Sequence, residues 1–246
     1  MVNLNKNTQL HGAMSLPKPF YETELGRLYH GDCLDILPHL EPVDLVLTDP
    51  PYEHQAHIGS RRTRAVIEGR KSNDLIQFDK ITPEQRGALT KINCNWILVF
   101  CQAEAVYIYA ETFGQFYKRP MVWIKPDCAP QFTGDRPAMG YESIVCAYLK
   151  NEKSRWNGGG KRGVYINNSS RHDTDHQTEK PVNLLIELIK DFHLGGVVLD
   201  PFFGSGSTAI ACERLKLKWI GIEREFKYVE ISVKRIEQER KQLKLF

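Results

Sequence analysis

Long apolar runs are missing from this chain of 246 residues. No segment approaches the roughly 20 consecutive apolar residues that a membrane-spanning helix needs, and the first residues lack the apolar stretch of a signal peptide. Charged residues make up 26% and hydrophobic residues 41% of the sequence, which is typical of a globular protein that buries a sizeable core. The sequence therefore predicts a soluble, cytoplasmic protein.

Closely spaced pairs of cysteine, which would suggest a zinc site, are also missing. The six cysteines are scattered along the chain, at Cys33, Cys94, Cys101, Cys128, Cys146 and Cys212. His54 and His57 lie close together, but no pattern of carboxylates accompanies them. We expect reduced, mostly buried thiols and no metal site.

The chain also lacks a large net charge, since its formal charge is only +3. Two segments nevertheless concentrate basic residues. Residues 53–80 contain Arg61, Arg62 and Arg64 with few acids, and residues 150–178 mix basic side chains, including Lys161 and Arg162, with aromatic and amide side chains. Such segments are either solvated loops or contacts to a phosphate backbone and a DNA groove, and we favour the contacts to DNA.

The most distinctive stretch is Asp49-Pro50-Pro51-Tyr52. The apolar residues 43–47 before it have the length of a buried parallel strand. Two consecutive prolines then exclude both helix and ladder hydrogen bonds, so the chain leaves the sheet in a stiff turn. This places a carboxylate and an aromatic ring beyond the carboxyl end of a strand, where open α/β sheets bind ligands.

A second informative stretch runs from residue 196 to residue 223. Residues 196–200 form an expected strand, and a glycine-rich turn containing Gly204 and Gly206 connects it to a helix over residues 209–215. A strand, a glycine-rich turn and a helix N-terminus make a site for the polar part of a nucleotide-like cofactor. About twenty residues further on, a second expected strand ends at Glu223, an acid placed to hold ribose hydroxyls.

These two motifs resemble those of the DNA amino-methyltransferases, which use S-adenosyl-L-methionine to methylate the exocyclic amino group of adenine or cytosine. The resemblance extends over roughly residues 26–240 and includes the His-x-Thr-x-Lys-Pro segment that ends at Pro181. The catalytic motif comes before the cofactor motif, an order that resembles the permuted beta class of this family.

The resemblance implies a role for each matching residue. Asp49, Pro50, Pro51 and Tyr52 would form the catalytic turn, in which Asp49 and the Pro50 carbonyl accept hydrogen bonds from the target amino group and Tyr52 stacks on the flipped base. The implied cofactor-binding residues are Asp32, Lys180, Asp200, Phe202, Gly204, Gly206, Thr208 and Glu223.

The implied fold is α/β, a single Rossmann-like methyltransferase domain with a circularly permuted motif order. Its sheet would have seven strands, mostly parallel with one antiparallel strand. The expected order by residues is 27–31, 219–223, 196–200, 43–47, 96–100, 144–148 and 121–124. Residues 1–25 are predicted to be a flexible lead-in, and residues 26–246 the domain, which carries the basic loop 53–80 and a small target-recognition insert at 150–178.

The predicted function is a site-specific DNA methyltransferase with double-stranded DNA as its partner and adenine N6 as the favoured target. N4 of cytosine is the alternative target. A nicotinamide dehydrogenase would leave Asp-Pro-Pro-Tyr unexplained, and protein glutamine methyltransferases carry Asn in place of Asp49. A catalytically inactive DNA-binding module is the non-enzymatic alternative, and a second copy of the chain, forming a homodimer, is a further candidate partner.

Overall fold

The protein is described here from a computed structural model, in residues 16–52, 80–131, 134–169 and 179–243. These residues contain one nine-stranded sheet with the order β1-β2-β9-β8-β3-β4-β6-β5-β7. Its strands are β1 (Tyr21–Glu22), β2 (Gly26–His30), β3 (Leu45–Thr48), β4 (Trp96–Cys101), β5 (Tyr117–Ile124), β6 (Tyr141–Tyr148), β7 (Val164–Ile166), β8 (Val197–Asp200) and β9 (Lys218–Glu223).

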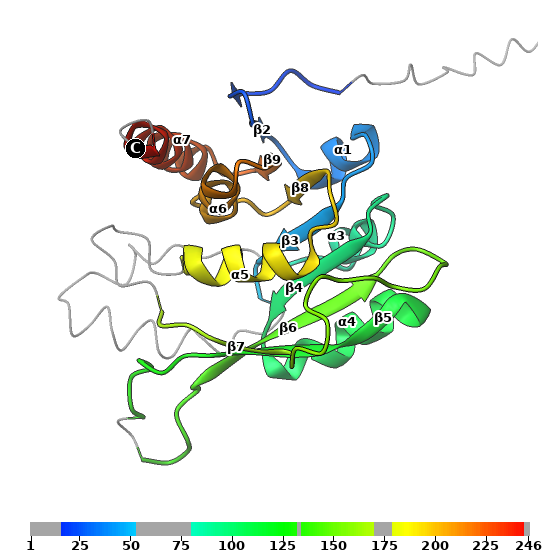
Figure 1. Cartoon of the computed structure of the whole chain (residues 1–246), viewed down its shortest axis with the longest axis vertical. Helices are drawn as coiled ribbons and strands as arrows, with labels where there is room; N and C mark the ends of the chain where they lie inside the picture. The colour runs from blue at the N-terminus through cyan, green and yellow to red at the C-terminus, as the bar shows by residue number, and fades with distance from the viewer. Residues whose placement is uncertain (1–15, 53–79, 132–133, 170–178, 244–246) are drawn as a thin grey trace, which may run out of the picture.

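Helices cover both faces of this sheet (Figure 1). On one face lie α5 (Val182–Phe192), α6 (Ser207–Leu215) and α7 (Phe226–Leu243), drawn in yellow to red. On the other face lie α1 (Cys33–Ile36), α3 (Pro83–Leu89) and α4 (Val106–Phe113), with the short 3₁₀ helices η1 (Leu37–His39), η4 (Ala103–Ala105) and η5 (Gly114–Phe116) beside them.

The buried strand β3 shows how the sequence produces this layered arrangement. Leu45 and Leu47 belong to the core on the α5 side, whereas Val46 belongs to the core on the α4 side. A strand buried on both faces needs apolar residues at every position, because successive side chains point to opposite faces. This explains why the segment reads as a continuous apolar run.

The predicted order of seven strands is confirmed, from β2 through β9, β8, β3, β4 and β6 to β5. β6 is antiparallel to both of its neighbours, as predicted for one strand of this pair. The predicted number of strands was wrong, because β1 pairs antiparallel with β2 and β7 pairs parallel with β5 at the two edges. Both extra strands are only two or three residues long, too short to give a period in the sequence.

Some local predictions can be compared with the described segments. The capping box at the start of α3 is present, with Thr82 and Gln85 each bonded to the other's backbone N–H. Residues 21–22 of the predicted lead-in form β1, and the division of the chain into lead-in and domain stays a prediction. All six cysteines are free and five of them are buried. Within the described part of the chain, no helix has the length and apolar character needed to cross a membrane.

Candidate active site

The Asp49–Tyr52 turn leaves the sheet at the carboxyl end of β3, near its centre. Thr48, the last residue of β3, pairs with Val99 of the parallel strand β4. The backbone of residues 50–52 is in no helix or strand, as two adjacent prolines require. Asp49 and Tyr52 are therefore delivered to the edge of the sheet at which parallel strands end.

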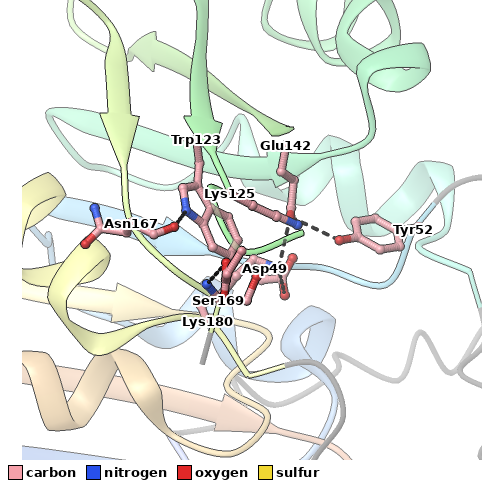
Figure 2. A network of polar contacts seen from close by, with 9 residues as sticks. Asp49, Tyr52, Trp123, Lys125, Glu142, Asn167, Ser169 and Lys180 are labelled. Atoms are coloured by element: carbon pink, nitrogen blue, oxygen red, sulfur yellow. Dashed lines mark hydrogen bonds and ion pairs between the residues drawn. The ribbon is translucent and has the colours of Figure 1, made fainter. Parts of the chain in front are cut away.

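Lys180, which precedes α5, fixes the Asp49 carboxylate. Its Nζ lies 2.6 Å from Asp49 Oδ2 and 3.0 Å from Glu142 Oε1, so the ammonium bridges two carboxylates (Figure 2). The same Nζ lies 5.0 Å from the centre of the Phe100 ring. The second carboxylate oxygen, Asp49 Oδ1, is shielded from solvent and accepts no hydrogen bond from any residue within the described ranges. Lys180 was predicted to bind the cofactor, and in the structure it lies against the Asp49–Tyr52 turn.

Glu142 enters the same cluster because β6 runs against its neighbours. Its register pairs Ser143 with Cys101, the last residue of β4. The first residues of β6 therefore lie at the edge where β4 ends. From there Glu142 Oε1 accepts a hydrogen bond from the Tyr52 hydroxyl at 3.0 Å, and Oε2 pairs with Lys125 Nζ at 2.7 Å (Figure 2).

Two ammonium groups thus balance two carboxylates in this cluster. Burial raises the pKa of Asp49 to about 6, and the charge of Glu142 acts in the same direction against the attraction of Lys180. Burial opposes the ionised form of Lys180, but Asp49 and Glu142 outweigh it and raise the pKa of Lys180 well above its usual value. Burial also opposes the ionised form of Glu142, but Lys180 and Lys125 outweigh it and lower its pKa. The bridge is therefore a cation held between two anions at neutral pH.

The glycine-rich turn after β8 lies beside the end of β9. Gly204 and Gly206 have φ angles of +52° and +81°, a region that L side chains rarely adopt. The Gly204 N–H donates to Glu223 Oε2 at 2.7 Å, and the Glu225 N–H donates to Glu223 Oε1 at 2.7 Å. No described atom lies within 4 Å of the position that a Cβ on Gly204 would take. The turn therefore faces open space beside a carboxylate that has further acceptor capacity.

Asp200 and Thr208 lie beneath this turn, inside the protein. Asp200 Oδ1 accepts hydrogen bonds from the Thr48 hydroxyl at 2.7 Å and from the Phe202 N–H at 3.2 Å, while Oδ2 accepts from the Thr208 hydroxyl at 2.7 Å. Burial raises the pKa of Asp200 to about 6 against these three hydrogen bonds. The carboxylate thus ties the glycine-rich turn to α6 and to the end of β3.

Asp32 and Glu223 are brought together by the pairing of β2 with β9. His30, the last residue of β2, pairs with Glu223, and the Gly31 N–H donates to the Glu223 carbonyl at 3.0 Å. Asp32 follows at once, and its side chain caps α1 by accepting from the Leu34 N–H at 2.9 Å. Two acids from distant parts of the sequence therefore lie at the ends of neighbouring strands, as predicted.

Arg235 of α7 links the glycine-rich turn to the segment that carries Lys180. Its guanidinium donates to the Ser205 carbonyl at 2.6 Å and to the Ser205 hydroxyl at 2.8 Å, and it pairs with Glu179. Because Glu179 precedes Lys180, this arginine connects the two halves of the site. Arg235 was not predicted as a site residue, because one arginine among the many charged residues of α7 carries no distinguishing signal.

The predicted DNA contacts are only partly within the described residues. Arg61, Arg62 and Arg64 lie outside them. Lys161 Nζ pairs with Glu187 at 2.8 Å and with Asp191 at 2.7 Å, both on α5, so its charge is already balanced. Arg162 is exposed.

Glu142 and Lys125 were not predicted as site residues. Glu142 precedes the apolar residues of β6, and a charged residue that begins a buried strand is a usable signal, because burying a charge is costly unless it is paired. Lys125 follows directly after β5 and carries no comparable signal.

A doubly covered, mostly parallel sheet with acids at the ends of β2 and β9 and a glycine-rich turn after β8 defines the class of Rossmann-like methyltransferases. A family model described as DNA methylase (N6_N4_Mtase) matches residues 43–234, well over half of the chain. The chain belongs to this family of DNA methylases, whose cofactor is S-adenosyl-L-methionine, as predicted.

Individual proteins agree with this assignment. The type II methyltransferase M.HinfI of Haemophilus influenzae is 26% identical over 249 residues, which cover 87% of this chain and 69% of that protein. The solved structure of the M1.HpyAVI–SAM complex has a TM-score of 0.65 at 24% identity and covers 86% of this chain and 100% of the other. The cytosine-N4-specific PvuII DNA methyltransferase has a TM-score of 0.66 at 17% identity, covering 88% of each chain. At these identities the two structures show a shared fold.

Proposed function

We propose that this DNA methylase transfers a methyl group to the exocyclic amino group of a base flipped out of the duplex, with N6 of adenine as the favoured target. The observation that carries the proposal is the state of the Asp49 carboxylate. Lys180 holds Oδ2 at 2.6 Å, while Oδ1 is buried and accepts no hydrogen bond from the described residues. A buried acceptor without a donor costs free energy, which an amino group of the substrate would recover.

The chemistry of the target explains why this arrangement suits it. The lone pair of an exocyclic amine is delocalised into the ring, so the nitrogen is a poor nucleophile. Asp49 Oδ1 and the Pro50 carbonyl would accept hydrogen bonds from the two amino hydrogens and favour a pyramidal nitrogen. Fixed acceptors of this kind act by positioning and electrostatics. The Tyr52 ring would stack on the flipped base and replace the stacking lost in the duplex.

The cofactor would lie along the ends of β2, β9 and β8. Glu223 and Asp32 would bind its ribose and adenine, and the Gly204–Gly206 turn beside Phe202 would receive its amino-acid part. Asp200 and Thr208 would act from beneath the turn, because the Asp200 carboxylate accepts hydrogen bonds from the hydroxyls of Thr208 and Thr48. Bound S-adenosyl-L-methionine supplies the methyl group. We assign the order of these elements to the beta class, since β3 precedes β8 in the chain.

Adenine is favoured over cytosine because residue 49 is Asp, whereas Ser at this position is commoner among enzymes of the family that methylate cytosine. The test is to incubate the protein with labelled S-adenosyl-L-methionine and duplex DNA and to separate the nucleosides after digestion. Labelled N6-methyl-2′-deoxyadenosine is expected. Labelled N4-methyl-2′-deoxycytidine would reassign the target, and unlabelled DNA would overturn the proposal.

Asp49→Ala tests the assignment of the site in the same assay. Methylation should be abolished while cofactor binding, measured by calorimetry, remains. Glu111→Ala removes an exposed carboxylate of α4 and serves as the control, with an unchanged rate expected. A near-normal rate for Asp49→Ala would show that this turn is not the catalytic site.

A further inference from the structure

We infer that Glu142 is a positioning residue that holds both ends of the Asp49–Tyr52 turn, Tyr52 directly and Asp49 through Lys180. This inference rests on the function proposed above. Glu142 lies outside both sequence motifs, and its strand is the one that runs antiparallel to β4 and β5.

The Glu142 carboxylate contacts three side chains of the cluster. Oε1 lies 3.0 Å from the Tyr52 hydroxyl and 3.0 Å from Lys180 Nζ, and Oε2 lies 2.7 Å from Lys125 Nζ. Each oxygen therefore has a charged partner, and one oxygen connects Tyr52 with the ammonium that holds Asp49. Figure 2 shows the three side chains converging on the Glu142 carboxylate from separate parts of the chain.

Because the cluster is buried, the partners of Glu142 must lie in well-defined positions. The side chain of Glu142 is 7% exposed and that of Lys180 is 9% exposed. A buried charge is tolerated only with well-placed partners, and the loss of one partner leaves the others uncompensated. Tyr52 and Lys180 are therefore confined to narrow positions around Glu142.

The effect on Tyr52 is specific to its hydroxyl. Residues 49–52 belong to no helix or strand, so backbone ladder bonds do not fix the Tyr52 ring. The hydrogen bond to Glu142 restrains rotation of the side chain about its Cα–Cβ bond. The ring is thereby pre-oriented for a base, which lowers the entropic cost of capturing it.

The surroundings of Glu142 extend to the candidate recognition insert. Trp123 is the direct cross-strand partner of Glu142, its ring lies 4.3 Å from Lys125 Nζ, and its Nε1–H donates to the Asn167 carbonyl at 2.8 Å. The Ser169 N–H donates to Asp127 at 2.8 Å. The described end of the insert is thus anchored beside the cluster that Glu142 organises (Figure 2).

A double-mutant cycle tests the inference. Tyr52→Phe removes the hydroxyl that donates to Glu142, and Glu142→Gln removes the charge of the acceptor. Single-turnover methylation is measured for each variant and for the pair. We expect each change to slow methylation by about ten-fold or more, because a hydrogen bond to a charged group is lost. The pair should be little slower than Glu142→Gln alone, since contacting residues are non-additive. Multiplicative effects would overturn the inference and leave the proposed function standing.

Two further measurements separate positioning from general damage. Glu213→Gln removes a buried charge of α6 that pairs with Arg240, and it should lower the melting temperature without changing the methylation rate of folded protein. Fluorescence of 2-aminopurine at the target should show weaker stacking in both Tyr52→Phe and Glu142→Gln. Tyr52→Phe keeps every buried charge, so it tests the contact even if Glu142→Gln fails to fold. Unchanged methylation and fluorescence in Tyr52→Phe would overturn the inference.

Crystal structures give a readout that does not depend on catalysis. In Glu142→Gln the Tyr52 ring should leave the position that it takes in the unchanged protein. An identical ring position would contradict the role of Glu142 even in a protein that proved inactive on DNA. A displaced ring in a protein that does not methylate DNA would instead contradict the proposed function alone.

Discussion

Lys180 Nζ lies 2.6 Å from Asp49 Oδ2 although the two residues are 131 positions apart in the chain. Their contact joins the His-x-Thr-x-Lys-Pro segment to the Asp-Pro-Pro-Tyr turn. The lysine therefore holds the orientation of the Asp49 carboxylate, the proposed acceptor, in addition to preceding helix α5. Its position also makes the ionisation of Asp49 depend on two neighbours of opposite charge.

The first prediction concerns the pH dependence of methylation. Burial raises the pKa of Asp49 to about 6, and the ionised carboxylate is the stronger acceptor, so the rate should fall as pH drops through about 6. Lys180 lowers this pKa, so Lys180→Met should move the acid limb to higher pH. Glu142 raises it, so Glu142→Gln should move the limb to lower pH. Rate profiles between acidic and neutral pH measure both shifts, and shifts in the same direction would contradict the electrostatic assignment.

A second prediction concerns the cofactor. Glu223→Ala should weaken the binding of S-adenosyl-L-methionine by roughly 1.5–3 kcal/mol, because charge-assisted hydrogen bonds to hydroxyls are lost. Calorimetry measures the affinity directly. Glu230→Ala, which removes an exposed carboxylate of α7, is the matched control and should bind normally. Equal affinities for the two variants would remove Glu223 from the cofactor site.

The third prediction separates two adjacent basic residues. Arg162 is exposed, whereas Lys161 is paired with Glu187 and Asp191. The slope of log DNA affinity against log salt concentration is called the salt slope. Arg162→Ala should reduce its magnitude by about 0.9, the contribution of one phosphate contact. Lys161→Ala should lower thermal stability and leave that slope unchanged. Replacement of Arg61, Arg62 and Arg64 by Ala should flatten the slope further, and a slope indifferent to all these changes would mean that the basic segments do not contact phosphates.

The fourth prediction concerns Arg235, which contacts Ser205 and Glu179. Arg235→Gln should weaken cofactor binding and slow methylation together, because both the glycine-rich turn and the segment before Lys180 lose a partner. Arg214→Gln breaks an ion pair with Glu239 that joins α6 to α7 and should leave both quantities unchanged. Loss of only one of the two activities would show that Arg235 does not connect the two halves of the site.

Most of the sheet could be predicted because its central strands are continuous apolar runs that end in recognisable turns. The order of the seven central strands followed from the family resemblance. β7 escaped prediction because only Tyr165 of its three residues is buried, so burial left almost no pattern to detect. β1 is stabilised mainly by its pairing with β2, a contact that its own two residues do not encode.

The candidate site divides in the same way. Asp49, Tyr52, Asp32 and Glu223 lie in short motifs whose residue types are tied to local turns, and sequence alone could point to them. Glu142 owes its place to the direction of β6, since only an antiparallel strand begins at the edge where β3 and β4 end. Topology of this kind is a property of the assembled sheet, so a single charged residue before an apolar run could not be assigned to a partner.

The pairing of β2 with β9 has a consequence for how the protein is made. His30 and Arg224, at the ends of these strands, are 194 positions apart and are joined by a hydrogen bond of 3.1 Å. During synthesis, β3 and β4 leave the ribosome well before β8 and β9. Until then β3 lacks its neighbour β8, and β2 lacks its parallel neighbour β9. Pairings over such separations form slowly, because a long loop must close first. The nascent chain would therefore carry its proposed catalytic turn before the proposed cofactor site is assembled, and we expect methylation only after the late strands have joined the sheet.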